Sequence, residues 1–385
     1  MAERNKCLRV LSSLLWVGAL VSARAAEAKL AKGKIPSQIT IGWSPAEASG
    51  VFATGTEYFE KAAADAKKHG LNVKIVTQAP SVQTHFAEQV NVIEDFIARH
   101  VDAIVISPAD VDSIKPAIKR ANAQHIPVII VNLLEPIPEV KIAQYIGFDN
   151  EMAGEVSGYA MLNFLGGPGP LKSQAGAAPT IQNPQGHLNL ASWQDIYKNV
   201  NPDTSAIKGK VAVINGIAGT IYANLRLKGF MKAVAPFSGV KVVEPLYADW
   251  NRQKAINAAQ DIIQAHPDIN AIWAASNEMG MGAELAVEGL HKKGQIQVLT
   301  NDGTPESVQM IKDQRLVAET WHGFPEWGWY GTQYGVMAAL GLPIPEKVDI
   351  DPRTEYIGNA ADFYPNVKLD PIPWDKIKSD YLANQ

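Results

Sequence analysis

Arg226 is the residue of this sequence whose type and position best suit the binding of a polar molecule. It lies six residues after Thr220 in the stretch KVAVINGIAGTIYANLRLKGF, residues 210–230. An apolar run, a glycine-containing turn and a helical pattern follow one another there, as in a parallel α/β unit. Ligands of such sheets bind outside the carboxyl ends of the strands, where a guanidinium can donate two hydrogen bonds at once. The alternative is a solvated arginine on an amphipathic helix.

Three more polar or aromatic residues follow apolar runs later in the chain. Asp302 stands in an Asn-Asp-Gly sequence at the end of an expected strand, which favours a ligand contact over a plain turn role. Asn277 either contacts a ligand or caps the helix that begins near Met279. Trp250 lies in an expected loop, where a large aromatic ring needs a packing partner, and we expect that partner to be the ligand.

Sequence signatures of catalysis are missing. The eight histidines never fall three to five residues apart, so no helical zinc pair exists, and there is no G-x-S-x-G elbow. Gly216 and Gly219 lack the third glycine of a dinucleotide fingerprint and the Lys-Ser/Thr of a phosphate loop. A carboxylate pair for glycoside hydrolysis stays open, because its separation of roughly 5–10 Å is spatial. We expect a protein that is not an enzyme and that needs no cofactor or metal.

Composition indicates a folded, exported protein. The chain has 385 residues, 46% of them hydrophobic, and its net charge of −4 argues against a nucleic-acid partner. Residues 1–25 have a basic start, an apolar run at 10–21 and the Ala23-Arg24-Ala25 site typical of a signal peptide. We expect cleavage after Ala25, or after Ala28. The alternative, a membrane anchor, needs about 20 apolar residues.

The cysteine count also suits a bacterial periplasm. The only cysteine, Cys7, lies in the expected signal peptide, so the mature chain would have no disulfide and no cysteine metal site. A large exported domain without disulfides fits that compartment, because its size alone supplies the core.

Short apolar runs alternate with helical patterns along the chain, in two series. The pattern predicts strands at residues 39–43, 71–77, 103–107, 127–131, 143–147, 210–215, 240–246, 271–275, 295–300 and 317–321. Helical patterns separate most of these runs, and such repeats specify parallel sheets with helices on both faces. We therefore expect two similar doubly wound α/β lobes. Residues 166–208, rich in Gly, Pro, Ala, Gln and Asn, are interpreted as an ordered insertion on the second lobe rather than a linker, part of which packs as a helix around Trp193 and Tyr197.

With these features in view, the chain resembles a known family, the periplasmic sugar-binding proteins of ABC importers. The resemblance is to the ribose-binding-like branch, whose fold is shared with the cores of LacI-type repressors, and it covers about residues 39–341. Five stretches carry it, and they occur in the family's order: 102–108 (DAIVISP), 216–230 with GIAGT and Arg226, 248–250 (ADW), 276–279 (SNEM) and 301–305 (NDGTP).

The resemblance implies two lobes joined by a three-segment hinge, with crossings near residues 148–149, 322–323 and 350–352. Its lobes would comprise residues 37–148 with 323–350, and 149–322 with 351–385. By the same resemblance, eight residues would contact a ligand between the lobes. They are Trp43, Phe52, Asn132, Arg226, Trp250, Asn277, Asp302 and His322.

Departures from the family pattern bear on the ligand. Many relatives carry an Asp-Arg pair after the fourth strand of the first lobe, whereas this chain has Asn132 and Leu133. Together with Trp43, Trp250, Trp273 and Trp321, which we expect at strand ends or crevice loops, this predicts a site more aromatic and less charged than a ribose site. A glycoside, a polyol or a less polar molecule would fit such a site.

The resulting hypothesis is a periplasmic, monomeric protein that captures a sugar-like molecule and delivers it to an ABC permease. Two alternatives remain at the level of the sequence: an adaptor that reports its ligand to a sensor kinase or chemoreceptor, and a periplasmic enzyme on the same scaffold. A LacI-type repressor is disfavoured, because the signal peptide stands where a helix-turn-helix would be.

Overall fold

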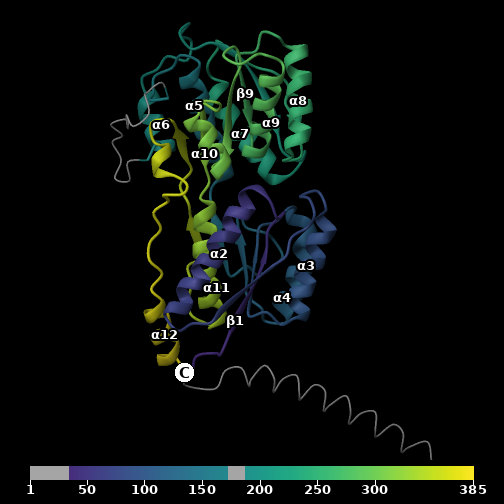
Figure 1. The fold of residues 1–385 in the computed structure, drawn as a ribbon, viewed down its shortest axis with the longest axis vertical. Coiled ribbons are helices and arrows are strands. Elements are labelled where there is room, and N and C mark those ends of the chain that lie inside the picture. Colours follow the sequence, from purple (N-terminus) through teal and green to yellow (C-terminus); the bar gives the residue numbers. More distant parts are fainter. Residues whose placement is uncertain (1–33, 172–186) are drawn as a thin grey trace, which may run out of the picture.

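The computed structural model describes residues 34–171 and 187–385 and shows two stacked α/β lobes (Figure 1). The expected signal peptide, residues 1–25, and the middle of the expected insertion lie outside the described residues. No helix within the described ranges is both long enough and apolar enough to cross a membrane.

The first lobe is built on a six-stranded parallel sheet in the order β12-β5-β4-β3-β1-β2. Its central strands are short, wholly apolar and fully buried, as in AIVI of β3 and VIIV of β4, which is typical of strands covered on both faces. The strands are β1 (Ile39–Ser44), β2 (Val73–Thr77), β3 (Ala103–Ile106), β4 (Val128–Val131), β5 (Gln144–Gly147) and β12 (Lys347–Asp349).

Helices cover both faces of this sheet. On one face α2 (Gly50–Lys68) packs against α11 (Phe324–Ala339), and on the other α3 (Phe86–Ala98) packs against α4 (Val111–Ala123). The core between the sheet and the first pair contains Phe59, Trp327 and Val336.

The second lobe repeats this design with the order β13-β11-β10-β9-β6-β7, and β8 extends β6 beyond β7. All pairs are parallel except β11 with β13. The strands are β6 (Gly209–Asn215), β7 (Val240–Val242), β8 (Leu246–Tyr247), β9 (Ala271–Ala274), β10 (Gln297–Asp302), β11 (Ala318–Trp321) and β13 (Arg353–Tyr356).

Two helix pairs complete the second lobe, α5 (Asn150–Phe164) with α7 (Ile221–Val234) and α8 (Arg252–Ala265) with α9 (Asn277–Gly289). The shorter α10 (Pro305–Lys312) and the 3-10 helix η1 (Ala360–Asp362) contact each other. The expected pair of doubly wound lobes is confirmed. The two-residue β8 is separate from β7 because Pro245 has no N–H for the ladder.

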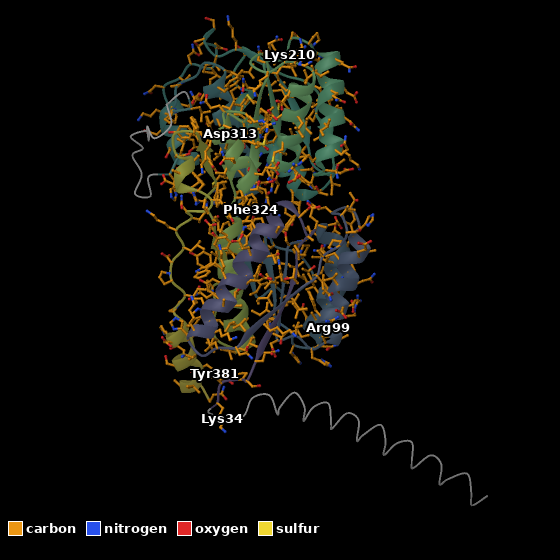
Figure 2. All side chains as sticks on the ribbon, in the orientation of Figure 1. Lys34, Arg99, Lys210, Asp313, Phe324 and Tyr381 are labelled. Atoms are coloured by element: carbon orange, nitrogen blue, oxygen red, sulfur yellow. The ribbon has the colours of Figure 1, made fainter. Side chains whose placement is uncertain are left out.

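The chain passes between the lobes at residues 148–149, 322–323 and 350–352, because β5, α11 and β12 belong to the first lobe and α5, β11 and β13 to the second. Phe324, which begins α11, lies at the level where the lobes meet (Figure 2).

The C-terminal tail is placed differently from our expectation that residues 351–385 belong to the second lobe. Its last helix, α12 (Trp374–Ala383), lies beside the first lobe (Figure 1). There the ring of Trp374 is fully buried and donates a hydrogen bond from Nε1 to Asp65 of α2 at 3.0 Å. The apolar face of α12 (Trp374, Ile377 and Tyr381) joins the first lobe's core, so the chain crosses between the lobes once more after η1.

The described end of the insertion packs on the second lobe. Helix α6 (Leu190–Tyr197) buries Trp193 and Tyr197, the two aromatic residues around which we expected a helix. Trp193 donates from Nε1 to the hydroxyl of Thr354 at 2.8 Å, which connects α6 to β13. The part of the expected insertion that forms α6 therefore packs on the second lobe.

Candidate functional site

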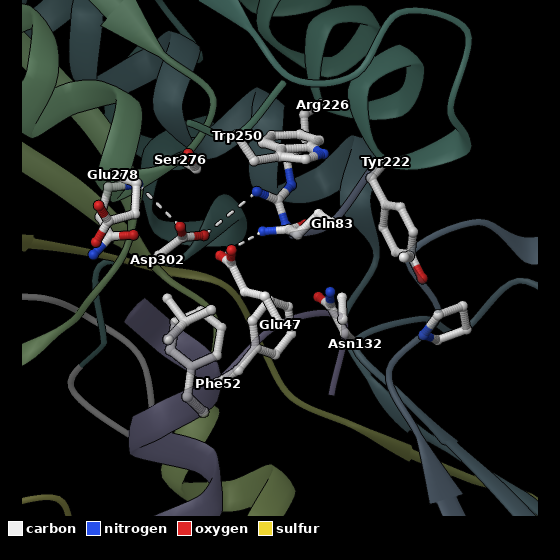
Figure 3. Close-up of a pocket in the computed structure, with 16 residues that line it drawn as sticks. Glu47, Phe52, Gln83, Asn132, Tyr222, Arg226, Trp250, Ser276, Glu278 and Asp302 are labelled. Atoms are coloured by element: carbon white, nitrogen blue, oxygen red, sulfur yellow. Dashed lines mark hydrogen bonds and ion pairs between the residues drawn. The ribbon is translucent and has the colours of Figure 1, made fainter. Parts of the chain in front are cut away.

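A cleft of about 540 Å³ lies between the lobes, at the carboxyl ends of strands from both sheets. The first lobe supplies Ala46, Glu47, Val51, Phe52, Gln83, Pro108, Ala109, Asn132 and Phe324, and the second supplies Tyr222, Arg226, Trp250, Ser276, Asn277, Glu278 and Asp302 (Figure 3).

Arg226 reaches the cleft because α5 and α7 pack unusually close together. A Cβ on Gly154 of α5 would lie 2.0 Å from the carbonyl oxygen of Arg226, and one on Gly229 of α7 would lie 1.8 Å from the carbonyl oxygen of Glu151. Any larger residue at either position would force the helices apart. The pair of glycines therefore sets the depth at which the guanidinium lies.

The guanidinium of Arg226 is buried and held by the second lobe itself. Nε donates to Asn150 at 3.0 Å, and Nη1 donates to the carbonyl oxygen of Ala275 at 2.7 Å and to Asp302 Oδ1 at 3.4 Å. The ring of Trp250 lies 5.3 Å from the guanidinium carbon, within cation–π range. Arg226 is thus a cleft residue with fixed geometry, and the alternative of a solvated surface arginine is wrong.

Asp302 is the anionic partner of Arg226. It ends β10 with a positive φ of 108°, a conformation that is uncommon for non-glycine residues. Its Oδ2 accepts from the backbone N–H of Asn277 at 3.0 Å, and its Oδ1 lies 3.1 Å from His322 Nδ1. Burial alone would raise the pKa of Asp302, but His322 and Arg226 together lower it. The side chain is a carboxylate at neutral pH.

Aromatic rings form parts of two sides of the cleft. Trp250 follows β8 with a positive φ of 61°, and its indole lies over the backbone of Gly216, where a Cβ would come within 2.0 Å of Cζ2. Glycine at position 216 is therefore what allows the indole to lie flat. Phe52, in the first turn of α2, enters from the first lobe (Figure 3), and Phe324 of the same lobe also lines the cleft. A ligand between them would have aromatic surface on two sides.

Two amide side chains carry unused acceptors at the cleft. Asn277 donates from Nδ2 to Thr304 at 2.6 Å, while its buried Oδ1 has no partner among the described residues. Asn132, which follows β4 with a positive φ of 68°, also has a buried Oδ1 without a described partner. Ser276, not Asn277, caps α9 by accepting from the N–H of Met279. Because buried acceptors are normally satisfied, both amides are suited to receive ligand donors.

Comparison with known proteins agrees with this architecture. The sequence profile described as a periplasmic binding protein domain matches residues 41–342. The chain belongs to this family.

Individual members of the periplasmic binding protein family match over most of the chain. The ribose import binding protein of Salmonella typhimurium is 26% identical over 287 residues, which are 74% of this chain and 81% of that protein. A solute-binding protein of an ABC transporter from Mycobacterium smegmatis, solved with bound glycerol, is 27% identical with a TM-score of 0.65, covering 84% of this chain and 96% of its own. A further one from Actinobacillus succinogenes with bound D-allose has a TM-score of 0.69 at 22% identity, covering 84% of this chain and 100% of its own, and shows the shared fold.

Two of the eight residues implied by the resemblance do not line the cleft. Trp43 points into the core of the first lobe, where it stacks on Phe59 at 4.5 Å and donates from Nε1 to Thr56 at 2.8 Å. The apolar face of α2 covers the end of β1, so the ring is buried on the helix side of the sheet.

His322 lies behind Asp302 in the hinge, fully buried, with its ring stacked on Phe148 at 4.1 Å. Burial and the nearby Arg226 charge lower its pKa to about 4. Its Nδ1 lies 3.1 Å from Asp302 Oδ1, but among the described residues neither ring nitrogen makes a hydrogen bond of good geometry. His322 therefore packs behind the carboxylate without reaching the cleft.

The expectation of a tryptophan-rich cleft is also wrong. Of the tryptophans placed at strand ends or crevice loops from sequence, Trp273 stacks on Phe230 at 4.1 Å and Trp321 packs on Phe363, both fully buried in the second lobe. Among these tryptophans, Trp250 is the one that lines the cleft.

Sequence reasoning missed several lining residues, above all Glu47, Gln83 and Tyr222. Glu47 lies in the loop after β1 and accepts a hydrogen bond from Gln83 at 2.8 Å. The signal that could have found them is topological, since each lies in a loop or first helical turn that follows a strand at its carboxyl end.

Proposed function

We propose that the protein is the exported solute-binding component of an ABC importer, and that it captures a sugar-like molecule between its lobes. The observation that carries this proposal is the Arg226–Asp302 pair, held by buried hydrogen bonds and bordered by aromatic rings, in a cleft lined by both lobes. Relatives that bind ribose, D-allose and glycerol support a polyhydroxylated ligand.

The chemistry of the cleft suits such a ligand. A sugar ring has apolar faces, which aromatic rings such as Trp250 and Phe52 can cover for about 0.5–1.5 kcal/mol each beyond the buried area. Its hydroxyl edge can donate to Asp302, Asn132 and Asn277 and accept from Arg226, at roughly 1.5–3 kcal/mol for each hydrogen bond to a charged group. A few such contacts suffice for micromolar binding, about −8 kcal/mol.

Capture follows from the arrangement of the lobes. Because ligand contacts come from both lobes, a bound molecule stabilises the closed arrangement over any open one. The crossings at residues 148–149, 322–323 and 350–352 are short segments that can serve as the hinge. The closed form is then what the permease recognises. The signal-peptide pattern of residues 1–25 supports export, and we place the mature protein in the periplasm.

The test is binding by the purified mature protein. Mass spectrometry of co-purifying small molecules and a thermal-shift screen of monosaccharides and polyols should identify a ligand, and calorimetry should give its affinity. Arg226→Ala, Asp302→Ala and Trp250→Ala should each abolish or strongly weaken binding. Lys228→Ala, on the exposed face of the same helix as Arg226, should not. If no sugar or polyol shifts the melting temperature, the carbohydrate assignment fails; unchanged affinity in the three variants would overturn the site.

A further inference from the structure

The charges that line the cleft do not balance. Three carboxylates line it, those of Glu47, Glu278 and Asp302, against the single guanidinium of Arg226. Arg226 is paired with Asp302 at 3.4 Å. Glu278 receives two hydrogen bonds from Arg252, at 2.8 and 3.1 Å. Across residues 34–171 and 187–385, Glu47 makes no ion pair with any Lys, Arg or His.

Glu47 is placed to meet a ligand rather than solvent. It is half-buried in the loop between β1 and α2, and its carboxylate points up into the cleft between Phe52 and Asp302 (Figure 3). Gln83, whose Nε2 donates to Oε1 at 2.8 Å, holds the carboxylate in this orientation. The hydroxyl of Ser49, two residues on, also acts on the carboxylate as a hydrogen-bond donor, but neither Gln83 nor Ser49 carries a positive charge.

The surroundings of Glu47 disfavour its charged form. A Cβ on Gly50, three residues on, would lie 3.4 Å from Oε1 of Glu278 in the opposite lobe, so the Glu278 carboxylate lies close to the segment that carries Glu47. Burial, and then the nearby charge of Glu278, raise the pKa of Glu47. A carboxylate taken out of water without a cation is unfavourable, and the ligand is the group that can compensate it.

Resting on the function proposed above, we propose that Glu47 sets the charge class of the ligand. An ionised carboxylate only accepts hydrogen bonds. It therefore favours an ammonium group most, accepts hydroxyl groups, and repels a carboxylate or phosphate. The affinity order for otherwise matched sugars is amino sugar, then neutral sugar, then acidic sugar.

The alternative role for Glu47 is that of a plain hydroxyl acceptor. In that role it would bind neutral sugars and reject acidic ones, but it would give amino sugars no advantage. The charge imbalance of the cleft decides between the two, because a hydroxyl group satisfies the hydrogen bond without neutralising the charge, whereas an ammonium does both.

Matched sugar sets test this order. Calorimetry at pH 7 and fixed ionic strength compares D-glucose, D-glucosamine and D-glucuronate, then D-galactose, D-galactosamine and D-galacturonate. In the set that fits the cleft, the amino sugar should bind at least about tenfold tighter than its neutral parent and the acid at least about tenfold more weakly, as for charge-assisted contacts in a desolvated site.

Two variants that each remove one negative charge show whether the affinity order depends on Glu47 itself. Glu47→Gln keeps the shape and the contact with Gln83, and should reduce both differences to less than about threefold. Glu60→Gln makes the same charge change on the exposed face of α2, and should keep the order of wild type. The inference is overturned if the acidic sugar binds as tightly as its neutral parent, or if the amino sugar binds no more tightly than that parent. It is also overturned if Glu47→Gln leaves the affinity order unchanged.

Failure of the proposed function has a different signature. If neither set binds in any charge form, the carbohydrate assignment is wrong. The charge of the co-purifying molecule then decides the role of Glu47: a cation whose affinity falls at least about tenfold in Glu47→Gln supports it, and an anion or a neutral molecule overturns it.

Discussion

In the second lobe, each charged group that faces the cleft is held by other groups of the same lobe. Arg226 contacts Asn150, Ala275 and Asp302, and Asp302 also contacts Asn277 and His322. In the first lobe, the polar groups of the cleft meet few protein partners: Oδ1 of Asn132 has none among the described residues, and the one hydrogen bond between Glu47 and another cleft residue comes from Gln83.

This difference implies a division of roles between two walls of the cleft. The second-lobe wall comprises the lining residues of that lobe, among them Arg226, Trp250, Asn277 and Asp302. The first-lobe wall comprises those of the first lobe, among them Glu47, Phe52, Gln83 and Asn132. The second-lobe wall keeps the geometry of its charged groups without a ligand, because Arg226, Asp302 and Glu278 are each held by partners in the same lobe. These groups contribute to folding as well as to binding. The first-lobe wall completes its hydrogen bonds only with a ligand, so it contributes to affinity and closure. Substitutions in the second lobe should therefore change stability and affinity together, and those in the first lobe affinity alone.

Arg226→Ala should have the largest effect. It leaves Asp302 buried without its cation, and breaking a buried pair in this way costs about 3–5 kcal/mol. We expect a fall of that size in the free energy of unfolding, measured in urea, and loss of ligand binding by calorimetry. Lys228→Ala, which removes an exposed cation from the same helix, should change neither by more than about 0.5 kcal/mol. A stable Arg226→Ala protein would contradict a self-supporting wall.

His322 gives the second-lobe wall a pH dependence. Its pKa is lowered to about 4 in the folded protein, against about 6.5 in an unfolded chain. Because the unfolded state takes up the proton first as pH falls, stability should be full above pH 6.5 and decrease as pH falls toward 4. The decrease should be on the order of 2–3 kcal/mol.

Urea titrations at intervals from pH 8 to pH 4 measure this decrease in the free energy of unfolding, which is called the acid limb below. His322→Gln, whose amide can donate to Asp302 but does not titrate, should flatten it. His85→Gln, which removes an exposed histidine of the first lobe, should not. An acid limb that persists unchanged in His322→Gln would assign it to other groups.

A third effect comes from the strand pair behind this wall. Glu319 of β11 accepts from the N–H of Gly303 at 3.0 Å, next to Asp302, and stands directly opposite Glu355 of β13. Both carboxyl groups are buried, and burial raises both pKa values well above the usual range, with a further contribution to that of Glu355 from Glu319. Lys312 and Arg353 act in the opposite direction on Glu355. The pair is therefore stable when protonated.

The sign of this effect is opposite to that of His322. The unfolded chain releases both protons above about pH 4.3, so stability should fall as pH rises. Glu355→Gln imitates the protonated acid and should be more stable than wild type at pH 8 by on the order of 1–2 kcal/mol, with little difference at pH 5. Chemical unfolding at the two pH values measures this, and an equal difference at both would show that charge is not the cause.

The sequence predicts the second-lobe wall better than the first. The carboxyl ends of consecutive strands place Arg226, Trp250, Asn277 and Asp302 at one edge of a parallel sheet, which follows from topology alone. A sequence cannot show to which face of a strand end a side chain turns. The family resemblance places Trp43 at the cleft, whereas α2 covers the face of the sheet on which its ring lies.

Long-range contacts explain the other differences from the sequence prediction. Glu47 and Gln83 are 36 residues apart and form one polar corner only after α2 and β2 have folded between them. The return of α12 to the first lobe depends on Trp374 meeting Asp65, a contact across 309 residues. Amphipathic spacing predicts that α12 is a helix, but it does not predict which lobe covers it.

Asn132→Ala should have the smallest effect on stability and so gives the sharpest test of the two-wall comparison. The amide Oδ1 has no partner among the described residues. Its removal should therefore change the free energy of unfolding of the ligand-free protein only through strain in the backbone. Because Asn132 has a positive φ of 68°, where alanine is strained, Asn132→Gly is the matched variant that removes the amide without that strain. We expect Asn132→Gly to unfold within about 0.5 kcal/mol of wild type and to bind its ligand about tenfold more weakly, the loss of one hydrogen bond. Equal losses of stability and affinity in this variant would show that the first-lobe wall is as self-supporting as the second.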